Sequence, residues 1–258
     1  MRVVRAPVFT GVGVALVTLF DDRGDLDAPA TAALAAQLVG LGVRAVVVAG
    51  TTGEAAALEA GERIALLDAV RDELRAAVPV IAGTGAPSTR QAEALTRDAT
   101  EHGADAVLVL SPPGASDPRP YYEAVAKAAA GTPVLAYHYP KASSPGIAVR
   151  ELADLAVAGV KDSAGDAERL LRELHDYEGP VYTGSSALLS FAGPLGCAGA
   201  ILSLANVEPE RCARAFAGDV VAQAGLVEAH LAAHERFPRR LKEMVASRFG
   251  TSTVCRVA

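Results

Sequence analysis

Lys161 is the residue of this sequence with the most evident chemical potential, because it interrupts an apolar run where a polar turn begins. It lies in the stretch AVAGVKDSAGD, residues 156–166. A lysine at the end of a strand usually extends its amine into water. To be nucleophilic at neutral pH, its ordinary pKa of about 10.4 would have to fall by roughly 3 pH units, equivalent to about 4 kcal/mol. The pattern leaves two interpretations open, a surface charge or a reactive amine in a pocket.

Polar residues also follow the other apolar runs of the chain, whose interiors are almost entirely apolar. They are Thr18, Thr51 and Thr52, Ser111, Tyr137 to Tyr139, Thr183 and Ser203. If the runs are parallel strands, the loops at their carboxyl ends build the active site. These polar side chains would then gather around Lys161.

Eight short, β-branched apolar runs predict eight strands, at 11–18, 43–50, 78–85, 104–111, 132–139, 157–163, 179–186 and 198–206. Stretches with apolar residues three or four positions apart lie between them, for example at 29–42, 60–77 and 89–103, and this spacing is typical of helices. Nearly continuous apolar strands joined by helices indicate a parallel sheet covered on both faces. Eight such units favour a (β/α)8 TIM barrel, with a doubly wound open sheet as the alternative fold.

We expect the barrel to occupy residues 1–218 and a short C-terminal helical extension to occupy residues 219–258. Two further helical patterns support the extension, at 220–234 and 239–249. No linker or low-complexity segment marks a separate domain between them.

Composition narrows the classes of function. The formal charge of −6 and the scattered basic residues argue against a nucleic-acid surface, so small molecules are the expected partners. The apolar runs stop at strand length, which predicts no membrane association, and the N-terminus lacks the features of a secretory signal, which predicts a cytoplasmic location. Cys197, Cys212 and Cys255 lack metal-type spacing, and we interpret them as reduced core thiols.

Several stretches in combination resemble the dihydrodipicolinate synthase and N-acetylneuraminate lyase family of class I Schiff-base aldolases. The most specific are GTTGEAAAL from Gly50, YHYP from Tyr137, GVKDSAGD from Gly159 and ANVEP from Ala205. VPVIAGTGAPST from Val78 adds a supporting match. The resemblance covers nearly the whole chain and implies the same barrel that the strand count predicts.

The resemblance also implies roles for particular residues. Lys161 would form an imine with pyruvate or a related 2-keto acid, and Tyr137 would shuttle protons beside it. Thr51 and Thr52 would hold the substrate carboxylate in a turn. Gly184 and the backbone of Ile201 match family positions that line the same pocket. Imine chemistry requires no metal or diffusible cofactor, and we expect none. The family also implies a homo-oligomer, a dimer or a tetramer.

Departures from the family pattern bear on the substrate. The synthases carry two tyrosines after strand four, where this chain reads SPPGAS from Ser111, and the PYY string ending at Tyr122 belongs to the following helix. Lys141 and ASSPG stand where the synthases have a carboxylate-binding arginine. Ser185 and Ser186 replace the usual acidic residues. Leu19 replaces a proline, and the chain stops short of the family's last helical segment.

Three functions therefore stay open. The favoured one is a lysine-dependent aldolase or lyase that condenses or cleaves a 2-keto acid and an aldehyde other than the family's best-known substrates. The second is dihydrodipicolinate synthase itself, without the tyrosine and the arginine. The third is a non-catalytic barrel that binds a keto acid, since a fold alone does not guarantee activity.

Overall fold

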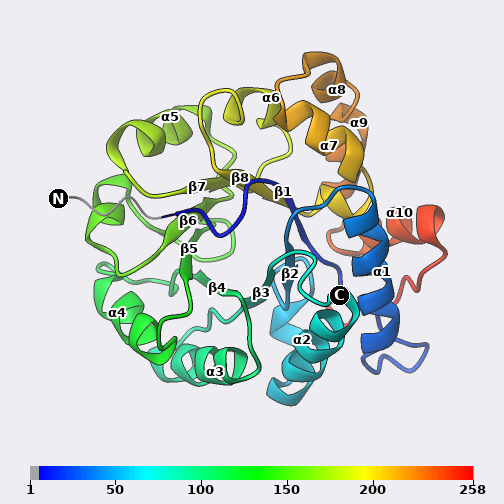
Figure 1. Ribbon diagram of the computed structural model, residues 1–258, viewed down its shortest axis with the longest axis horizontal. Helices are drawn as coiled ribbons and strands as arrows, with labels where there is room; N and C mark the ends of the chain where they lie inside the picture. Colours follow the sequence, from blue (N-terminus) through cyan, green and yellow to red (C-terminus); the bar gives the residue numbers. More distant parts are fainter. Residues whose placement is uncertain (1–5, 258) are drawn as a thin grey trace.

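Eight parallel strands close into a barrel in a computed structural model of the chain, which describes residues 6–257 (Figure 1). The strands pair in chain order, and β8 pairs with β1 to close the barrel. The bounds are β1 (Gly11–Ala15), β2 (Val46–Val48), β3 (Val80–Gly83), β4 (Ala106–Leu110), β5 (Val134–His138), β6 (Gly159–Asp162), β7 (Val181–Thr183) and β8 (Gly199–Leu202). The predicted TIM barrel is confirmed, and the open-sheet alternative is wrong. Each strand is shorter than its apolar run, because residues at one or both ends of the run lie in loops.

Helices surround the barrel (Figure 1). They are α1 (Ala28–Gly40), α2 (Ala60–Leu74), α3 (Thr89–Glu101), α4 (Arg119–Ala128), α5 (Ala167–Asp176), α6 (Leu189–Ala192) and α7 (Pro209–Phe216), with the 3-10 turns η1 (Ala55–Ala57), η2 (Val149–Asp154) and η3 (Leu204–Asn206). Three of these helices begin at polar caps whose side chains accept hydrogen bonds from backbone N–H groups, namely Asp27, Ser88 and Asp166. The caps therefore fix where these helices start relative to the strands they follow.

Three helices follow the barrel: α8 (Val220–Ala224), α9 (Val227–His234) and α10 (Arg239–Phe249). The pattern at 239–249 is confirmed as one helix, whereas the pattern at 220–234 is divided into two helices at Gly225 and Leu226. The periodicity of that segment does not reveal the break, because both halves have apolar residues. The division of the chain at residue 219 stays a proposal.

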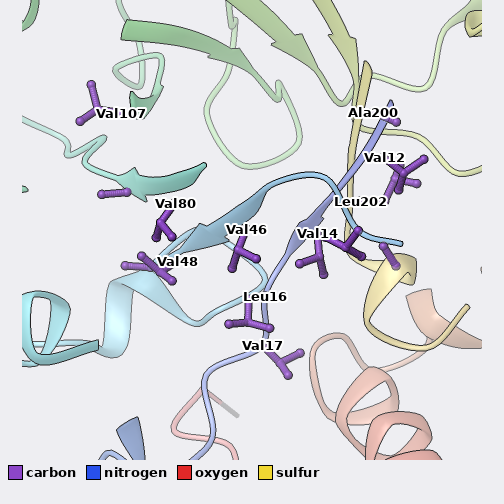
Figure 2. Packing of buried hydrophobic residues seen from close by; sticks show 14 of the residues in the cluster. Val12, Val14, Leu16, Val17, Val46, Val48, Val80, Val107, Ala200 and Leu202 are labelled. Carbon is purple, nitrogen blue, oxygen red and sulfur yellow. The ribbon is translucent and has the colours of Figure 1, made fainter. Parts of the chain in front are cut away.

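Successive side chains along each strand point alternately outward and inward, and they form two apolar layers. The outward-facing set packs between strands and helices and includes Val14, Val46 and Leu202, which Figure 2 shows close together. The inward-facing set fills the barrel and includes Val47 and Leu135. Because successive strand residues point to opposite faces, a polar residue on the inner face enters a dry interior.

Phe9 lies at the amino-terminal end of the barrel interior. Its ring stacks on Tyr182 with the ring centroids 4.8 Å apart, and the Tyr182 hydroxyl donates to the Phe9 carbonyl at 3.0 Å. A Cβ on Gly199 would lie 3.2 Å from the Phe9 ring and 2.6 Å from the Gly11 carbonyl, so glycine leaves the space that the ring needs. The Phe9 ring therefore fills the end of the barrel opposite the carboxyl ends of the strands.

The C-terminal segment returns to the loop after β2, and Figure 1 shows the chain end near α2. The fully buried amine of Lys242, on α10, lies 2.5 Å from the Glu54 carboxylate. The second carboxylate oxygen of Glu54 accepts from the backbone N–H groups of Arg256 and Val257 at 2.8 and 2.9 Å. The Arg256 guanidinium also pairs with Glu62 at 2.6 Å. The extension is thus fastened to the loop that carries Thr51 and Thr52.

None of the helices in residues 6–257 is long and apolar enough to cross a membrane. The three cysteines are free, and Cys197 and Cys212 are buried, as expected. Burial raises the pKa of both thiols to about 12, so they stay protonated. Cys255 is only half-buried, because it lies on the C-terminal segment rather than in the core.

Replacing Lys242 with methionine is expected to lower the free energy of unfolding by about 3–5 kcal/mol, because Glu54 would stay buried without its cation. The control is Lys127→Met, at an exposed lysine on α4, which should change it by less than about 0.5 kcal/mol. Urea unfolding followed by circular dichroism measures both variants. Equal unfolding midpoints would contradict the structural importance of this ion pair.

Candidate active site

Lys161 lies on the inner face of β6, and its side chain is almost fully buried, with 5% of its surface exposed. It pairs in register with Tyr137 of β5, and its amine lies 4.1 Å from the centre of the Tyr137 ring. Burial lowers the pKa of the Lys161 amine to about 7. The face of the Tyr137 ring attracts an ammonium group, which would raise the pKa of the amine. Because the pKa is nevertheless lowered, the loss of hydration outweighs this attraction. A substantial fraction of this amine is therefore neutral at neutral pH.

Tyr137 is the partner of this amine. Desolvation raises the pKa of its hydroxyl, while hydrogen bonds with Ser163 and Thr51 oppose that shift. The hydroxyl therefore stays protonated next to a partly neutral amine. The Tyr139 ring, directly after β5, stacks on Tyr137 at a centroid distance of 5.9 Å. The pair of Lys161 and Tyr137 combines a nucleophile with a proton donor.

Thr51 and Thr52 lie in the turn after β2, and Thr51 connects this turn to Tyr137. The Thr51 side chain is exposed, whereas Thr52 is buried. The segment after β1 supports the turn, since the Thr18 hydroxyl donates to the Gly53 carbonyl at 2.7 Å. Glu54, at the other side, has a left-handed backbone with φ of 56° and is held by the contacts to the C-terminal segment. The turn is therefore supported on both flanks.

Gly184 and Ile201, the other two predicted site residues, lie near Lys161 and Tyr137. Gly184 follows β7, and its N–H donates to the Asp162 carbonyl at 2.6 Å. A Cβ at this position would lie 1.9 Å from the Ser163 hydroxyl, so glycine leaves room for the serine that contacts Tyr137. Ile201 is buried on β8 among the inward-facing residues, the set that also contains Tyr137. The structure thus joins Lys161, Tyr137 and Thr51 directly, and Gly184 through Ser163.

Two supporting residues were missed as functional from the sequence. Ser163 lies two positions after Lys161, within the GVKDSAGD stretch, but only the fold shows that it contacts Tyr137. Asn206 lies in ANVEP, and its buried side chain accepts from the Val17 N–H at 3.1 Å and donates to the Ala15 carbonyl at 2.7 Å. Asn206 thereby ties the loop after β8 to the end of β1. In the sequence, the available signal was an asparagine at the end of the eighth apolar run.

Neither Tyr121 nor His138 replaces the tyrosine that is absent after β4. The Tyr121 hydroxyl interacts with the backbone of Ala86 at 3.1 Å from within α4. His138 lies on β5 in register with Asp162, and its Nδ1 accepts from the Ile147 N–H at 2.9 Å. Burial lowers the pKa of His138 to about 4, so its ring is neutral at physiological pH. Both side chains are engaged by backbone groups outside the Lys161 cluster.

Behind Lys161, a buried charged cluster holds β6 against α5. Asp162 follows the lysine and lies 3.4 Å from the Arg169 guanidinium, which also pairs with Glu173 at 2.7 Å. Burial raises the pKa of Glu173 to about 8, and the charge of Asp162 adds to this effect. One guanidinium thus faces two carboxyl groups, and a proton on Glu173 relieves their repulsion. This cluster fixes the end of the strand that carries the amine.

A closed (β/α)8 barrel with a buried amine against a tyrosine at its strand ends is the architecture of a class I aldolase. Residues 8–253 match the dihydrodipicolinate synthetase family. A DapA-like lyase from Halobacterium salinarum is 40% identical over 210 residues, which cover 78% of this chain and 68% of that protein. A 4-hydroxy-tetrahydrodipicolinate synthase from Pseudomonas aeruginosa is 36% identical over 230 residues, which cover 83% of this chain and 78% of that protein.

A solved structure extends the comparison. YagE, an E. coli K12 prophage protein of the dihydrodipicolinic acid synthase family in complex with pyruvate, is 26% identical, with a TM-score of 0.90 over 98% of this chain and 93% of that chain. This chain belongs to the dihydrodipicolinate synthetase family. The expected class of function, a pyruvate-dependent aldolase or lyase, is confirmed at the level of the family.

Replacing Gly184 with alanine is expected to lower the rate of catalysis by about 10- to 100-fold, because the new methyl group must displace Ser163 and with it the hydrogen bond to Tyr137. The double variant Gly184→Ala/Ser163→Gly relieves the clash but still lacks the hydrogen bond to Tyr137. It should therefore regain protein stability but not the catalytic rate. Gly61→Ala on α2, where a Cβ would meet no atom within 4 Å, is the matched control. Steady-state consumption of pyruvate measures the effect. A Gly184→Ala variant as active as Gly61→Ala would contradict this role.

Proposed function

We propose that Lys161 forms an imine with pyruvate or a close 2-keto acid, and that the protein uses this adduct to make or break a carbon–carbon bond to an aldehyde. The observation that carries the proposal is the buried Lys161 amine, 4.1 Å from the Tyr137 ring and with a pKa lowered to about 7. A surface lysine would keep its charge and could not attack a ketone.

The residues around the amine suit the steps of this reaction. The neutral amine attacks the ketone carbon, and the resulting carbinolamine loses water with a proton supplied by Tyr137. The iminium withdraws electrons from the methyl carbon of pyruvate, which then loses a proton. The product is an enamine, and this carbon is its nucleophilic atom. Backbone N–H groups and hydroxyls of the Thr51 and Thr52 turn are suited to hold the keto-acid carboxylate. The covalent imine supplies the electron sink, so this chemistry needs no diffusible cofactor.

A cytoplasmic location and a homo-oligomeric assembly, a dimer or a tetramer, stay predictions. Both follow from sequence features and from the family resemblance. Gel filtration with light scattering measures the assembly directly.

Borohydride added together with pyruvate should fix a mass increment on the peptide that contains Lys161. The Lys161→Ala variant, and the native protein with borohydride alone, should show none. Lys161→Arg keeps the charge but cannot become neutral at workable pH, so it should also remain unlabelled. Lys127, which is exposed, serves as the internal control. Labelling that is spread evenly over the lysines would contradict the proposed aldolase function and would favour a barrel that only binds a keto acid.

The same trapping reaction has an expected pH dependence. Raising the pH deprotonates the amine, so the labelling rate should rise through pH 7 and level off above it. Below this range the rate should fall about tenfold per pH unit as the neutral amine disappears. A rate that continues to rise towards pH 10 would indicate an unshifted lysine.

Dihydrodipicolinate synthase activity is the second candidate, and it has less support. The loop after β4 carries Pro113 and Gly114 in place of tyrosines, and Tyr121 and His138 are engaged elsewhere. The loss of a general-acid relay commonly lowers rates by about 10²- to 10⁴-fold. We therefore expect kcat/KM for aspartate semialdehyde with pyruvate to lie at least 10²-fold below that of the preferred aldehyde, as an aldehyde panel would show. Preference for aspartate semialdehyde would overturn this ranking.

A further inference from the structure

The carboxylate of Asp162 has no role in imine formation, although it belongs to the residue that follows the catalytic lysine on β6. Neighbouring residues on a strand point to opposite faces, so its side chain points away from the barrel interior, towards α5. It is buried, with 4% of its surface exposed. A buried carboxylate is unfavourable unless it is paired or hydrogen-bonded. Both oxygens of Asp162 have partners, and each partner has a different consequence.

The first carboxylate oxygen closes a turn around Ser163. Oδ1 of Asp162 accepts from the Ala164 N–H at 2.7 Å. An aspartate that binds the N–H group two residues further on forms an Asx-turn, which fixes the backbone of the residue between them. That residue is Ser163, and its own N–H donates to the His138 carbonyl at 2.9 Å. The backbone of Ser163 is therefore held both by β5 and by the side chain of Asp162.

The turn brings the Ser163 hydroxyl to the catalytic tyrosine. This hydroxyl hydrogen-bonds with Tyr137, and the missing Cβ of Gly184 leaves the space for it. Desolvation raises the pKa of Tyr137, and the charge of Asp162 adds to this shift, so the carboxylate is close enough to act on the phenol. A covalent and hydrogen-bonded path thus leads from Asp162 through Ser163 to Tyr137.

The second carboxylate oxygen is held from α5. Oδ2 of Asp162 lies 3.4 Å from the Arg169 guanidinium, and Arg169 pairs with Glu173, one turn further along the helix, at 2.7 Å. The Asp166 cap accepts from the Arg169 N–H at 3.2 Å, so the start of α5 places the guanidinium. Burial, together with the charge of Asp162, raises the pKa of Glu173 to about 8, so this group holds a proton at neutral pH. The ionised pair within the cluster is then Asp162 with Arg169.

We propose that Asp162 is a positioning residue, whose carboxylate, held by Arg169, folds the turn that presents the Ser163 hydroxyl to Tyr137. In the proposed function, on which this inference rests, Tyr137 supplies the proton that removes water from the carbinolamine. Ser163 fixes the direction of the phenol beside Lys161. Without this contact Tyr137 would keep its hydrogen bond with Thr51, which belongs to an exposed part of the turn after β2.

The test follows the exchange of pyruvate methyl protons with deuterium by NMR, which reports imine and enamine formation without an aldehyde. Asp162→Ala removes the acceptor for the Ala164 N–H, so kcat for exchange is expected to fall about fivefold or more. KM for pyruvate should change by less than about twofold, because the turn after β2 is untouched. Asp162→Asn keeps an acceptor oxygen, and Glu173 can lose its proton to balance Arg169. The asparagine variant should therefore keep about half of the native rate or more.

The control is Asp105→Ala, at an aspartate with the same kinds of contact at the opposite end of the barrel. Asp105 precedes β4, accepts from the Val80 N–H at 2.8 Å and pairs with Arg71 at 3.0 Å. Its loss should leave the exchange rate within about twofold of the native rate. An Asp162→Ala variant as fast as Asp105→Ala, or an Asp162→Asn variant as slow as Asp162→Ala, would overturn the role of Asp162. A native protein that exchanges no methyl protons would overturn the proposed function as well.

A double-mutant cycle shows whether Asp162 acts through Ser163. Ser163→Ala removes the hydroxyl that contacts Tyr137 and should slow exchange by about fivefold. If the two residues act in one path, Asp162→Ala/Ser163→Ala should be less than about twofold slower than the slower single variant. Independent effects would multiply to about 25-fold and would rule out the path through Ser163. All variants are compared at a temperature at which circular dichroism shows each to be folded, so that a loss of structure is not counted as a loss of rate.

Discussion

Desolvation of one lysine amine is the constraint on which the rest of this structure depends. The pKa of the Lys161 amine is lowered to about 7 because the barrel interior removes its hydration. This low hydration requires apolar side chains on the inner faces of the neighbouring strands. It also requires that the amino-terminal end of the barrel is closed, and the stacked rings of Phe9 and Tyr182 close it. The neighbouring phenol of Tyr137 responds to the same burial in the opposite sense, since its pKa rises. One dry environment thus yields a neutral base and a protonated acid side by side.

In the proposed function, the interior alone does not position the keto acid, because its carboxylate must be held by loops. The turn with Thr51 and Thr52 is therefore the second structural requirement. Its support comes from distant parts of the chain: the Thr18 hydroxyl from the segment after β1, and Lys242 and Arg256 from the C-terminal extension. A buried ion pair contributes little net stability but costs much when one partner is lost. The extension consequently affects the geometry of a site that it does not itself enter.

The eight strands and the longer helices could be predicted from periodicity because local apolar patterns determine them. Lys161, Tyr137 and Thr51 could be identified because each ends an apolar run and belongs to a recognisable stretch. The contact of Ser163 with Tyr137 and the tie between Asn206 and β1 could not be predicted. They join residues far apart in the chain, and their geometry exists only after the barrel has closed. The break at Gly225 was hidden because both sides of it follow a helical pattern.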